Sequence, residues 1–337
     1  RQGNPFDVDA AVIDEAQVLS ALQWAALDPM LGNCPKIWVA GDDDQAIYDF
    51  SGGSSEVFRA MGELPTIVKL EKSRRCPRHV MRVADEALRY IGTRVPKHAE
   101  PQERDGKATV VVDLLDIDFT EGEWMILVRQ HAHAKDIYQH LRMLGLQHRT
   151  TKHGESIRQS EKDLIRAHSA LCAGRGIPAG NVPSYMKALS RSLVAHGYKN
   201  KAADTVRRLG LGTITPELLV ASFGLQKKAL YLPWFEVFDK LPAETVEFIR
   251  RTLESGDFYK DRRIEVSTVH GAKGREAENV VIVDFQGYRQ KKSMEKGEED
   301  EYRVAYVAMT RALNALYLLS PLEGTNPPTS YRRFFRE

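Results

Sequence analysis

Short apolar runs that alternate with helical stretches are the feature that most restricts the fold. The runs expected as strands cover residues 10–13, 36–40, 66–70, 109–112, 124–128, 264–269, 280–285 and 316–319, and helices are expected over 78–91, 133–144 and 299–313. Buried runs separated by helices are typical of parallel sheets with helical crossovers. The sequence therefore predicts an α/β protein.

The pattern changes between residues 173 and 258. Helical periods dominate this stretch, and Pro or Gly interrupts them at positions 178, 183, 197, 210, 216, 233 and 242. We expect a mostly helical insertion in the α/β domain, because Pro and Gly end helices rather than extend them.

Charge is divided unevenly along the chain, although the net charge is only +2. Residues 1–65 hold eleven acidic and three basic side chains, whereas residues 149–210 hold twelve Lys or Arg and four Asp or Glu. The overall balance excludes a histone-like protein. The division suggests a cation site in the acidic part and a polyanionic partner for the basic part.

Cysteine content and hydropathy exclude further classes of protein. Cys34, Cys76 and Cys172 are far apart in sequence and form no CxxC pair, which argues against a disulfide scaffold and a cysteine zinc site. No apolar run approaches the ~18 residues that a membrane span requires. The sequence therefore predicts a cytoplasmic protein, associated with the nucleoid if bacterial or located in the host cytoplasm if encoded by a phage.

An acidic pair, Asp14 and Glu15, directly follows the apolar run at 10–13. Ligands of α/β folds bind at the carboxyl ends of parallel strands. One carboxylate there can take part in a Mg²⁺ shell, and its neighbour can orient an attacking water. The alternative is a helix N-terminus that carries two favourable acids.

A second acidic stretch, residues 41–53, follows the run at 36–40. It contains three consecutive aspartates, whose mutual repulsion makes an ordinary surface loop a poor explanation. Gln45 offers both a donor and an acceptor, which suits a phosphate oxygen or a water. Tyr48 and Phe50 follow beside a Gly-rich turn, and for each of these aromatics core packing remains the alternative.

Basic side chains near later strands suit a phosphate ligand. Arg74 and Arg75 precede a predicted helix start, where free backbone N–H groups also face an anion, although a solvated basic turn is the alternative. His270 and Lys273 lie among small residues after the run at 264–269, a setting that allows close backbone approach to a phosphate. A structural histidine is the alternative for His270. Arg311 lies within an apolar helical stretch and needs either a partner or an exit from the apolar surroundings.

In this order, the five stretches closely resemble the motifs of superfamily 1A DNA helicases of the UvrD/Rep/PcrA type. Residues 41–48, Gly-Asp-Asp-Asp-Gln-Ala-Ile-Tyr, are the most specific. The resemblance covers nearly the whole chain and is weakest over 173–258. It implies RecA-like parallel-sheet motor domains. The expected domains are part of the first motor domain at 1–65, a second, complete one at 66–172 and 259–337, and a helical insertion subdomain at 173–258.

The resemblance also implies roles for individual residues, with ATP and Mg²⁺ as cofactors. For hydrolysis, Asp14 corresponds to the Mg²⁺-associated acid, Glu15 to the base that activates water and Gln45 to the γ-phosphate sensor. Arg75 and Arg311 correspond to the two arginine fingers, and Glu276 corresponds to the ribose contact. For DNA, Tyr48 and Phe50 correspond to the segment that meets the bases, and Thr268 and His270 correspond to the link between nucleotide state and DNA.

The chain departs from the family pattern at five positions. Arg74 replaces a tyrosine that stacks on adenine, and a guanidinium plane can also stack. Phe50 replaces tryptophan, and Ser51 replaces an arginine that contacts a DNA phosphate. Arg275 and Ala277 replace apolar residues beside the ribose contact.

A phosphate-binding loop of the form GxxxxGK[ST] does not occur in the sequence. The family places this loop upstream of the acidic pair. We therefore expect the chain to be the C-terminal portion of a longer helicase, inactive as an ATPase without the missing N-terminal motor segment. The resemblance implies movement on single-stranded DNA, 3′ to 5′, and unwinding of duplex DNA, with repair or replication proteins as partners.

Two rival functions remain open at this point. In the first rival function, the chain is a helicase-like subunit of a nuclease complex, although no nuclease-like acidic cluster follows Arg311 in the sequence. In the second it is a non-hydrolysing DNA-binding regulatory module that has kept the fold. The four catalytic positions Glu15, Gln45, Arg75 and Arg311 argue against the second rival.

Overall fold

The computed structural model describes residues 8–48, 55–61, 66–151, 154–285, 287–320 and 330–335. The chain divides into two compact units. One unit is formed by Arg1–Ile137 together with Arg263–Glu337, and the other by Tyr138–Arg262. The second unit is therefore inserted into the sequence of the first.

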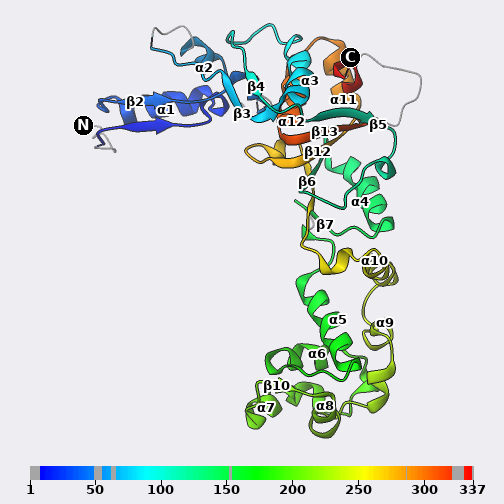
Figure 1. Ribbon diagram of the computed structural model, residues 1–337. Helices are drawn as coiled ribbons and strands as arrows, with labels where there is room; N and C mark the ends of the chain where they lie inside the picture. The colour runs from blue at the N-terminus through cyan, green and yellow to red at the C-terminus, as the bar shows by residue number, and fades with distance from the viewer. Residues whose placement is uncertain are drawn as a thin grey trace. The chain divides into compact units, whose positions relative to one another are not determined.

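Parallel strands form the centre of the first unit (Figure 1), in the order β5, β13, β12, β6, β11. Their bounds are Lys107–Val111, Ala312–Leu319, Ala277–Val283, Trp124–Val128 and Ile264–Thr268. Strand β6 lies between two neighbouring strands and is buried at every residue, as is typical of a parallel sheet that is covered on both faces. The predicted α/β fold with a parallel sheet is confirmed.

Helices α3 (Arg78–Leu88) and α12 (Asp300–Met309) supply much of the core of the first unit. Val80, Ala84 and Leu88 of α3 are buried at a spacing of four residues, which places them on one face of the helix. Helix α12 is buried along nearly its whole length. Both helices share one hydrophobic cluster with the strands of the sheet. Helix α11 (Tyr288–Glu295) precedes α12.

A smaller parallel pair, β1 (Ala11–Ile13) and β2 (Ile37–Val39), lies near the start of the described chain. Helix α1 (Ala21–Leu31) connects the two strands, and α2 (Ser55–Met61) follows them. All three residues of β2 are exposed, and α1 has no buried residue. Parallel sheets are normally covered on both faces, so this pair has apolar faces that the described residues leave uncovered.

The prediction of a strand over residues 66–70 is wrong. Val68 is 82% exposed and Leu70 is 91% exposed, and this stretch is not a strand. The strand instead begins at Lys72 and forms β3 (Lys72–Pro77), which pairs in parallel with β4 (Glu100–Gln102). The composition of residues 66–70 favours a strand, but a strand also requires a hydrogen-bonded neighbour, and that neighbour lies beside the following residues.

The second unit is mostly helical and includes residues 173–258. Its helices are α5 (Gln159–Cys172), α6 (Val182–Ala188), α7 (Tyr198–Leu209), α8 (Pro216–Phe223), α9 (Trp234–Val237) and α10 (Ala243–Glu254), and its short antiparallel pairs are β7 (His148–Thr150) with β8 (Gly154–Glu155) and β9 (Ile177–Pro178) with β10 (Thr213–Ile214). Helix α4 (Ala134–Met143) contains the boundary between the units. The helices enclose a hydrophobic core of their own.

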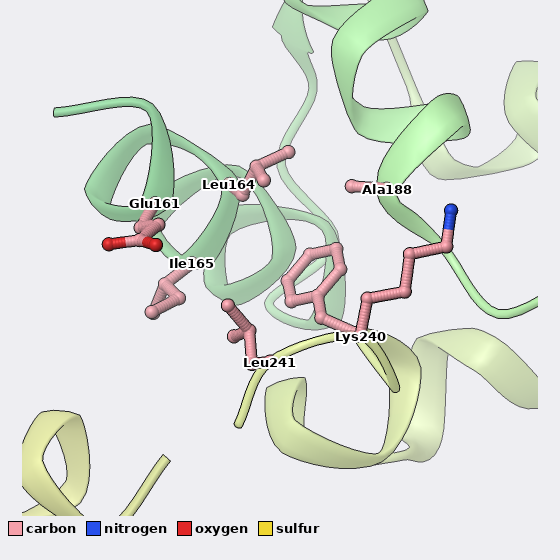
Figure 2. A pocket seen from close by; sticks show the side chains of 7 residues that line it. Glu161, Leu164, Ile165, Ala188, Lys240 and Leu241 are labelled. Atoms are coloured by element: carbon pink, nitrogen blue, oxygen red, sulfur yellow. The ribbon is translucent and has the colours of Figure 1, made fainter. Parts of the chain in front are cut away.

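A pocket of about 100 Å³ opens in the second unit. Figure 2 shows its apolar lining, with Glu161 and Lys240 as the charged members. This set of side chains offers no group of residues suited to catalysis. Within the described part of the chain, no helix combines the length and the hydropathy needed to cross a membrane.

Candidate functional site

The two acidic stretches meet at one edge of the β1–β2 pair. Asp14 and Glu15 follow β1, and the three aspartates follow β2; the strands run parallel, so these residues lie at the same edge. Buried Gln17 links the two stretches, because its Nε2 donates to Glu15 Oε2 at 2.8 Å and its Oε1 accepts the Asp42 N–H at 3.2 Å.

Glu15 has a left-handed backbone, with φ of 53° and ψ of 36°. Among the described residues it is the one non-glycine residue with positive φ. Such a conformation is costly for a side chain with a Cβ and is often retained at functional sites. The Glu15 side chain is 51% exposed, and its Oε2 lies 3.0 Å from Lys273 Nζ.

Gln45 and Arg311 contact each other across 266 positions of sequence. Arg311 Nη2 donates to Gln45 Oε1 at 3.1 Å, while Gln45 Nε2 donates to Asp42 Oδ2 at 2.7 Å. Gln45 ends the 3₁₀ turn η2 (Asp43–Gln45), and Arg311 directly precedes β13. The predicted sensor and the second predicted finger are therefore neighbours.

Arg311 is a buried cation, only 1% exposed. Its guanidinium donates to the Val307 and Arg275 carbonyls and the Thr310 hydroxyl as well as to Gln45, and all of these acceptors are neutral. Burial, followed by the positive charge of Arg75, lowers the pKa of Arg311 to about 10. Within the described chain it has no carboxylate partner, so the site retains positive charge that an anion would balance.

Arg75 and Glu276 form an ion pair, with 2.6 Å between Arg75 Nε and Glu276 Oε2. Arg75 lies on β3, and Glu276 directly precedes β12. The first predicted finger thus contacts the residue predicted to bind ribose. Arg74 is exposed, and its carbonyl accepts a hydrogen bond from Gln102 Nε2.

The residues predicted to contact DNA are partly brought together. The Tyr48 hydroxyl donates to the His270 carbonyl at 3.0 Å, and His270 Nε2 lies 3.1 Å from the Ile47 carbonyl. The Thr268 hydroxyl accepts the Gly271 N–H at 3.1 Å, which stabilises the turn η10 (His270–Ala272). Burial, helped by Glu15, raises the pKa of Tyr48, so its hydroxyl stays a donor at neutral pH. Phe50 lies outside the described residues.

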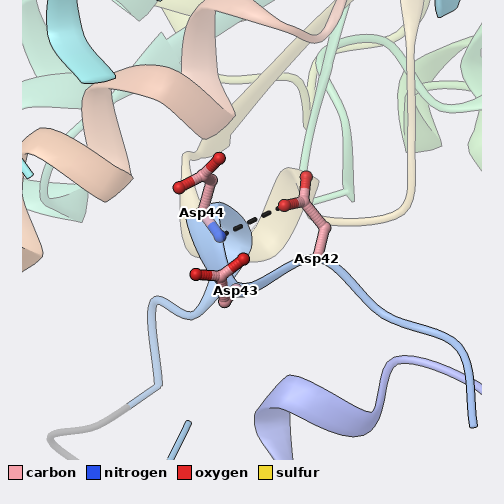
Figure 3. A group of neighbouring side chains, drawn as sticks. All are labelled: Asp42, Asp43 and Asp44. Carbon is pink, nitrogen blue, oxygen red and sulfur yellow. Dashed lines mark hydrogen bonds between the residues drawn. The ribbon is translucent and has the colours of Figure 1, made fainter. Parts of the chain in front are cut away.

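Asp42, Asp43 and Asp44 project from one turn (Figure 3), where the Asp44 N–H donates to Asp42 Oδ1 at 3.1 Å. Asp43 and Asp44 are buried. Arg94 binds Asp44 with two hydrogen bonds, of 2.9 and 2.6 Å, and Lys97 Nζ contacts all three carboxylates.

These side chains could hold a metal ion by composition and proximity. Because cations of the protein already occupy them, we assign them a structural role instead. We call the group formed by the three aspartates with Arg94 and Lys97 the acid–base cluster.

Sequence reasoning missed Arg94, Lys97 and Arg303 as members of this region. Arg303, 3% exposed on its side chain, donates to the Asp43 carbonyl and to Thr93. Three adjacent acids, two of which are buried in the structure, require cations nearby, and their adjacency was a usable signal. It could not reveal which of the many basic residues would supply the charge.

The residues present fit a nucleotide and a divalent cation. Asp14 is exposed, and one of its carboxylate oxygens accepts the Glu15 N–H at 2.8 Å, so it can still offer an oxygen ligand to Mg²⁺. Arg311 supplies uncompensated positive charge for a phosphate. An open pocket of about 260 Å³ is lined by Glu15, Val18, Tyr48, Lys273 and Gly274.

Two family models match the chain. The UvrD/REP helicase N-terminal domain matches residues 5–64, and the UvrD-like helicase C-terminal domain matches residues 242–322. These matches contain the acidic edge and the Arg311 region that the structure brings together.

In these two segments the chain is similar to the UvrD-like helicases.

A bacterial protein of similar sequence is also described as a helicase. The chain is similar to a protein of Bacillus subtilis (strain 168) described as "Putative ATP-dependent DNA helicase YjcD", with 21% identity over 96% of this chain and 53% of that protein. The chain therefore spans about half the length of this relative. The predicted UvrD/Rep/PcrA resemblance is confirmed by the two family matches.

Proposed function

We propose that the chain works within an ATP-dependent DNA helicase or translocase that moves 3′ to 5′ on single-stranded DNA and unwinds duplex DNA. The observation that carries this proposal is the 3.1 Å contact between Gln45 and Arg311. It joins the acidic edge of the first predicted motor domain to a cation of the second, as a nucleotide bound between two motor domains requires. We use "whole protein" for a polypeptide that contains this chain together with a GxxxxGK[ST] loop.

Each residue has a defined task in the proposed reaction. Asp14 would hold Mg²⁺, which supplies charge neutralisation for the phosphates, and Glu15 would accept the proton of the attacking water. Gln45 orients the terminal phosphate, while Arg75 and Arg311 stabilise the charge that develops on it. Separation of the Arg75–Glu276 pair would free Arg75 for the phosphate and Glu276 for the ribose.

The proposal retains the remaining predictions made from the sequence. Arg74 would stack on the nucleotide base, and Tyr48, Phe50, Thr268 and His270 would contact single-stranded DNA. The domain bounds 1–65, 66–172 with 259–337, and 173–258 remain predictions, as do repair or replication proteins as partners and a cytoplasmic location.

ATP hydrolysis and strand displacement by the whole protein test this function. We expect single-stranded DNA to stimulate ATPase activity, and we expect a duplex with a 3′ overhang to be unwound in preference to one with a 5′ overhang. Glu15→Gln should abolish turnover and leave DNA binding in place. DNA binding without any ATPase activity in the unmodified whole protein would favour the regulatory module instead.

The 337-residue chain alone is expected to show no DNA-stimulated ATPase activity, because its sequence contains no loop that can enclose the β- and γ-phosphates. A coupled phosphate-release assay with purified chain, with and without single-stranded DNA, measures this. Sustained turnover that Glu15→Gln removes would contradict the expectation, since it would place a complete hydrolytic site in this chain.

The basic surface of α7 is expected to contribute to duplex binding. Lys201 and Arg208 are exposed, and Arg207 pairs with Asp204 where both side chains are exposed. Replacing Lys199, Lys201, Arg207 and Arg208 by Gln should flatten the dependence of log affinity on log salt, by ~0.9 for each DNA phosphate that is no longer neutralised.

The control for this measurement removes three exposed arginines of the first unit, Arg78 and Arg82 within α3 and Arg89 at its C-terminal cap. Fluorescence anisotropy across a salt series gives both slopes. An unchanged slope in the α7 variant would identify its charges as an ordinary solvated surface.

A further inference from the structure

Lys273 carries a buried ammonium group that the proposed reaction leaves without a task. Its side chain is 8% exposed, and it follows the turn η10. Nζ lies 3.0 Å from Glu15 Oε2, within reach of electrostatic attraction, yet within the described chain it makes no hydrogen bond of acceptable geometry. An ammonium group has three donors, and burying them unused costs free energy.

Lys273 lines a pocket that is open enough to admit a ligand. It lines the 260 Å³ pocket together with Glu15 and Tyr48, and its ammonium lies 5.3 Å from the centre of the Tyr48 ring. Gly274, the next residue, has φ of +77°, and a Cβ built on it would meet nothing within 4 Å. A buried cation with unused donors beside an open pocket suits an anionic ligand rather than a closed structural pair.

The other charges near Lys273 are already engaged. Arg275 pairs with Glu265, and Arg75 pairs with Glu276, so neither takes Glu15 as its partner. Arg311 donates to neutral acceptors. Glu15 therefore depends on Lys273 for its ionic contact.

We propose that Lys273 is a positioning residue that exchanges between Glu15 and a terminal phosphate group. It pairs with Glu15 while the pocket lacks an anion, and it turns to the phosphate when a nucleotide enters. Glu15 is then released to act on water only when there is a phosphate to attack. This proposal rests on the proposed function, because it adds regulation to the same site.

Tripolyphosphate binding to the purified 337-residue chain, measured by isothermal titration calorimetry at low salt without Mg²⁺, tests the exchange. We expect Lys273→Met to weaken binding at least tenfold. Glu15→Gln should strengthen binding several-fold, because it removes the group that competes for the ammonium. The double variant should bind like Lys273→Met, since the gain depends on Lys273.

The control is Lys260→Met, which removes an exposed lysine of the second unit and should leave the affinity unchanged. A full Glu15→Gln gain that persists in the Lys273→Met background would overturn the proposal, because charge removal alone would then explain it. Unchanged affinity in Lys273→Met would do the same.

Glu15→Gln leaves the buried lysine intact, so it serves as the second variant if Lys273→Met does not fold. A Glu15→Gln affinity no higher than that of the unmodified chain would overturn the exchange by itself. The whole measurement is independent of hydrolysis. If the whole protein showed no ATPase activity while the variants showed the expected tripolyphosphate affinities, the proposed function would be rejected. Lys273 would then still be an anion-binding residue.

Discussion

Arg311→Ala in the whole protein is expected to lower the ATP turnover number by ~10³–10⁵-fold, the range found for arginine fingers in phosphoryl transfer. The reason is the uncompensated charge of this side chain. Arg311 is buried against neutral acceptors and contacts Gln45 at 3.1 Å, so its charge is available to the developing phosphate charge. Steady-state ATPase assays at saturating single-stranded DNA measure the loss.

Burial makes a structural control necessary for this variant. Removing Arg311 also removes its hydrogen bonds to Val307 and Thr310. Arg311→Met keeps most of the side-chain volume and should lose turnover to the same extent. DNA affinity without nucleotide should stay close to that of the unmodified protein in both variants. Equal losses of turnover and DNA affinity in a folded variant would instead assign Arg311 a structural role.

Arg94→Met is expected to lower the free energy of unfolding of the chain by about 3 kcal/mol, at the lower end of the range for breaking a buried ion pair. Asp44 is 0% exposed and accepts two hydrogen bonds from Arg94. The substitution leaves its carboxylate buried with Lys97, at 2.9 Å, as the remaining cation. The hydrogen bonds to Asp44 raise the pKa of Arg94, so its guanidinium keeps its charge. Urea denaturation followed by circular dichroism measures the change.

An exposed ion pair of the first unit provides the comparison. Arg78 lies 2.8 Å from Asp105, with side chains that are mostly open to solvent. Arg78→Met should cost less than about 1 kcal/mol, as surface pairs do. Similar losses in the two variants would show that the acid–base cluster contributes no more than an ordinary surface contact.

The central strands were predicted well from the sequence because a buried strand is a continuous run of apolar residues. The expected strand at 124–128 has the same bounds as β6, whose five residues are all buried between two neighbours. The prediction was wrong at 66–70, where a run with three apolar residues has no neighbouring strand among the described residues and is largely exposed. Composition reports the tendency to form a strand, while the partner that completes it is chosen by the tertiary fold.

The C-terminal end of the helix expected over 299–313 was also predicted incorrectly. Helix α12 stops at Met309, and Arg311 lies after it rather than inside it, before β13. The Thr310 hydroxyl donates to the Tyr306 and Val307 carbonyls and so satisfies acceptors at the helix end. No Gly or Pro marks this position, so periodicity alone extended the helix too far.

Motif residues were easier to predict than the contacts that hold them. Asp14, Glu15 and Gln45 are recognisable because they lie within a few residues of the ends of strand-forming runs. Lys97 belongs to a connecting segment with no periodic pattern, and its three carboxylate contacts depend on residues more than fifty positions away. Such contacts follow from the closed fold rather than from local sequence.

The great sequence separation within the site has a consequence for the order of folding. Gln45 and Arg311 are 266 positions apart, and Tyr48 and His270 are 222 apart. Closing loops of this length costs chain entropy before any contact forms, which slows folding. The second unit lies inside both loops, and prior folding of Tyr138–Arg262 shortens the flexible chain that remains to be closed. The site is therefore expected to be among the last parts of the chain to assemble, so that folding intermediates do not yet contain it.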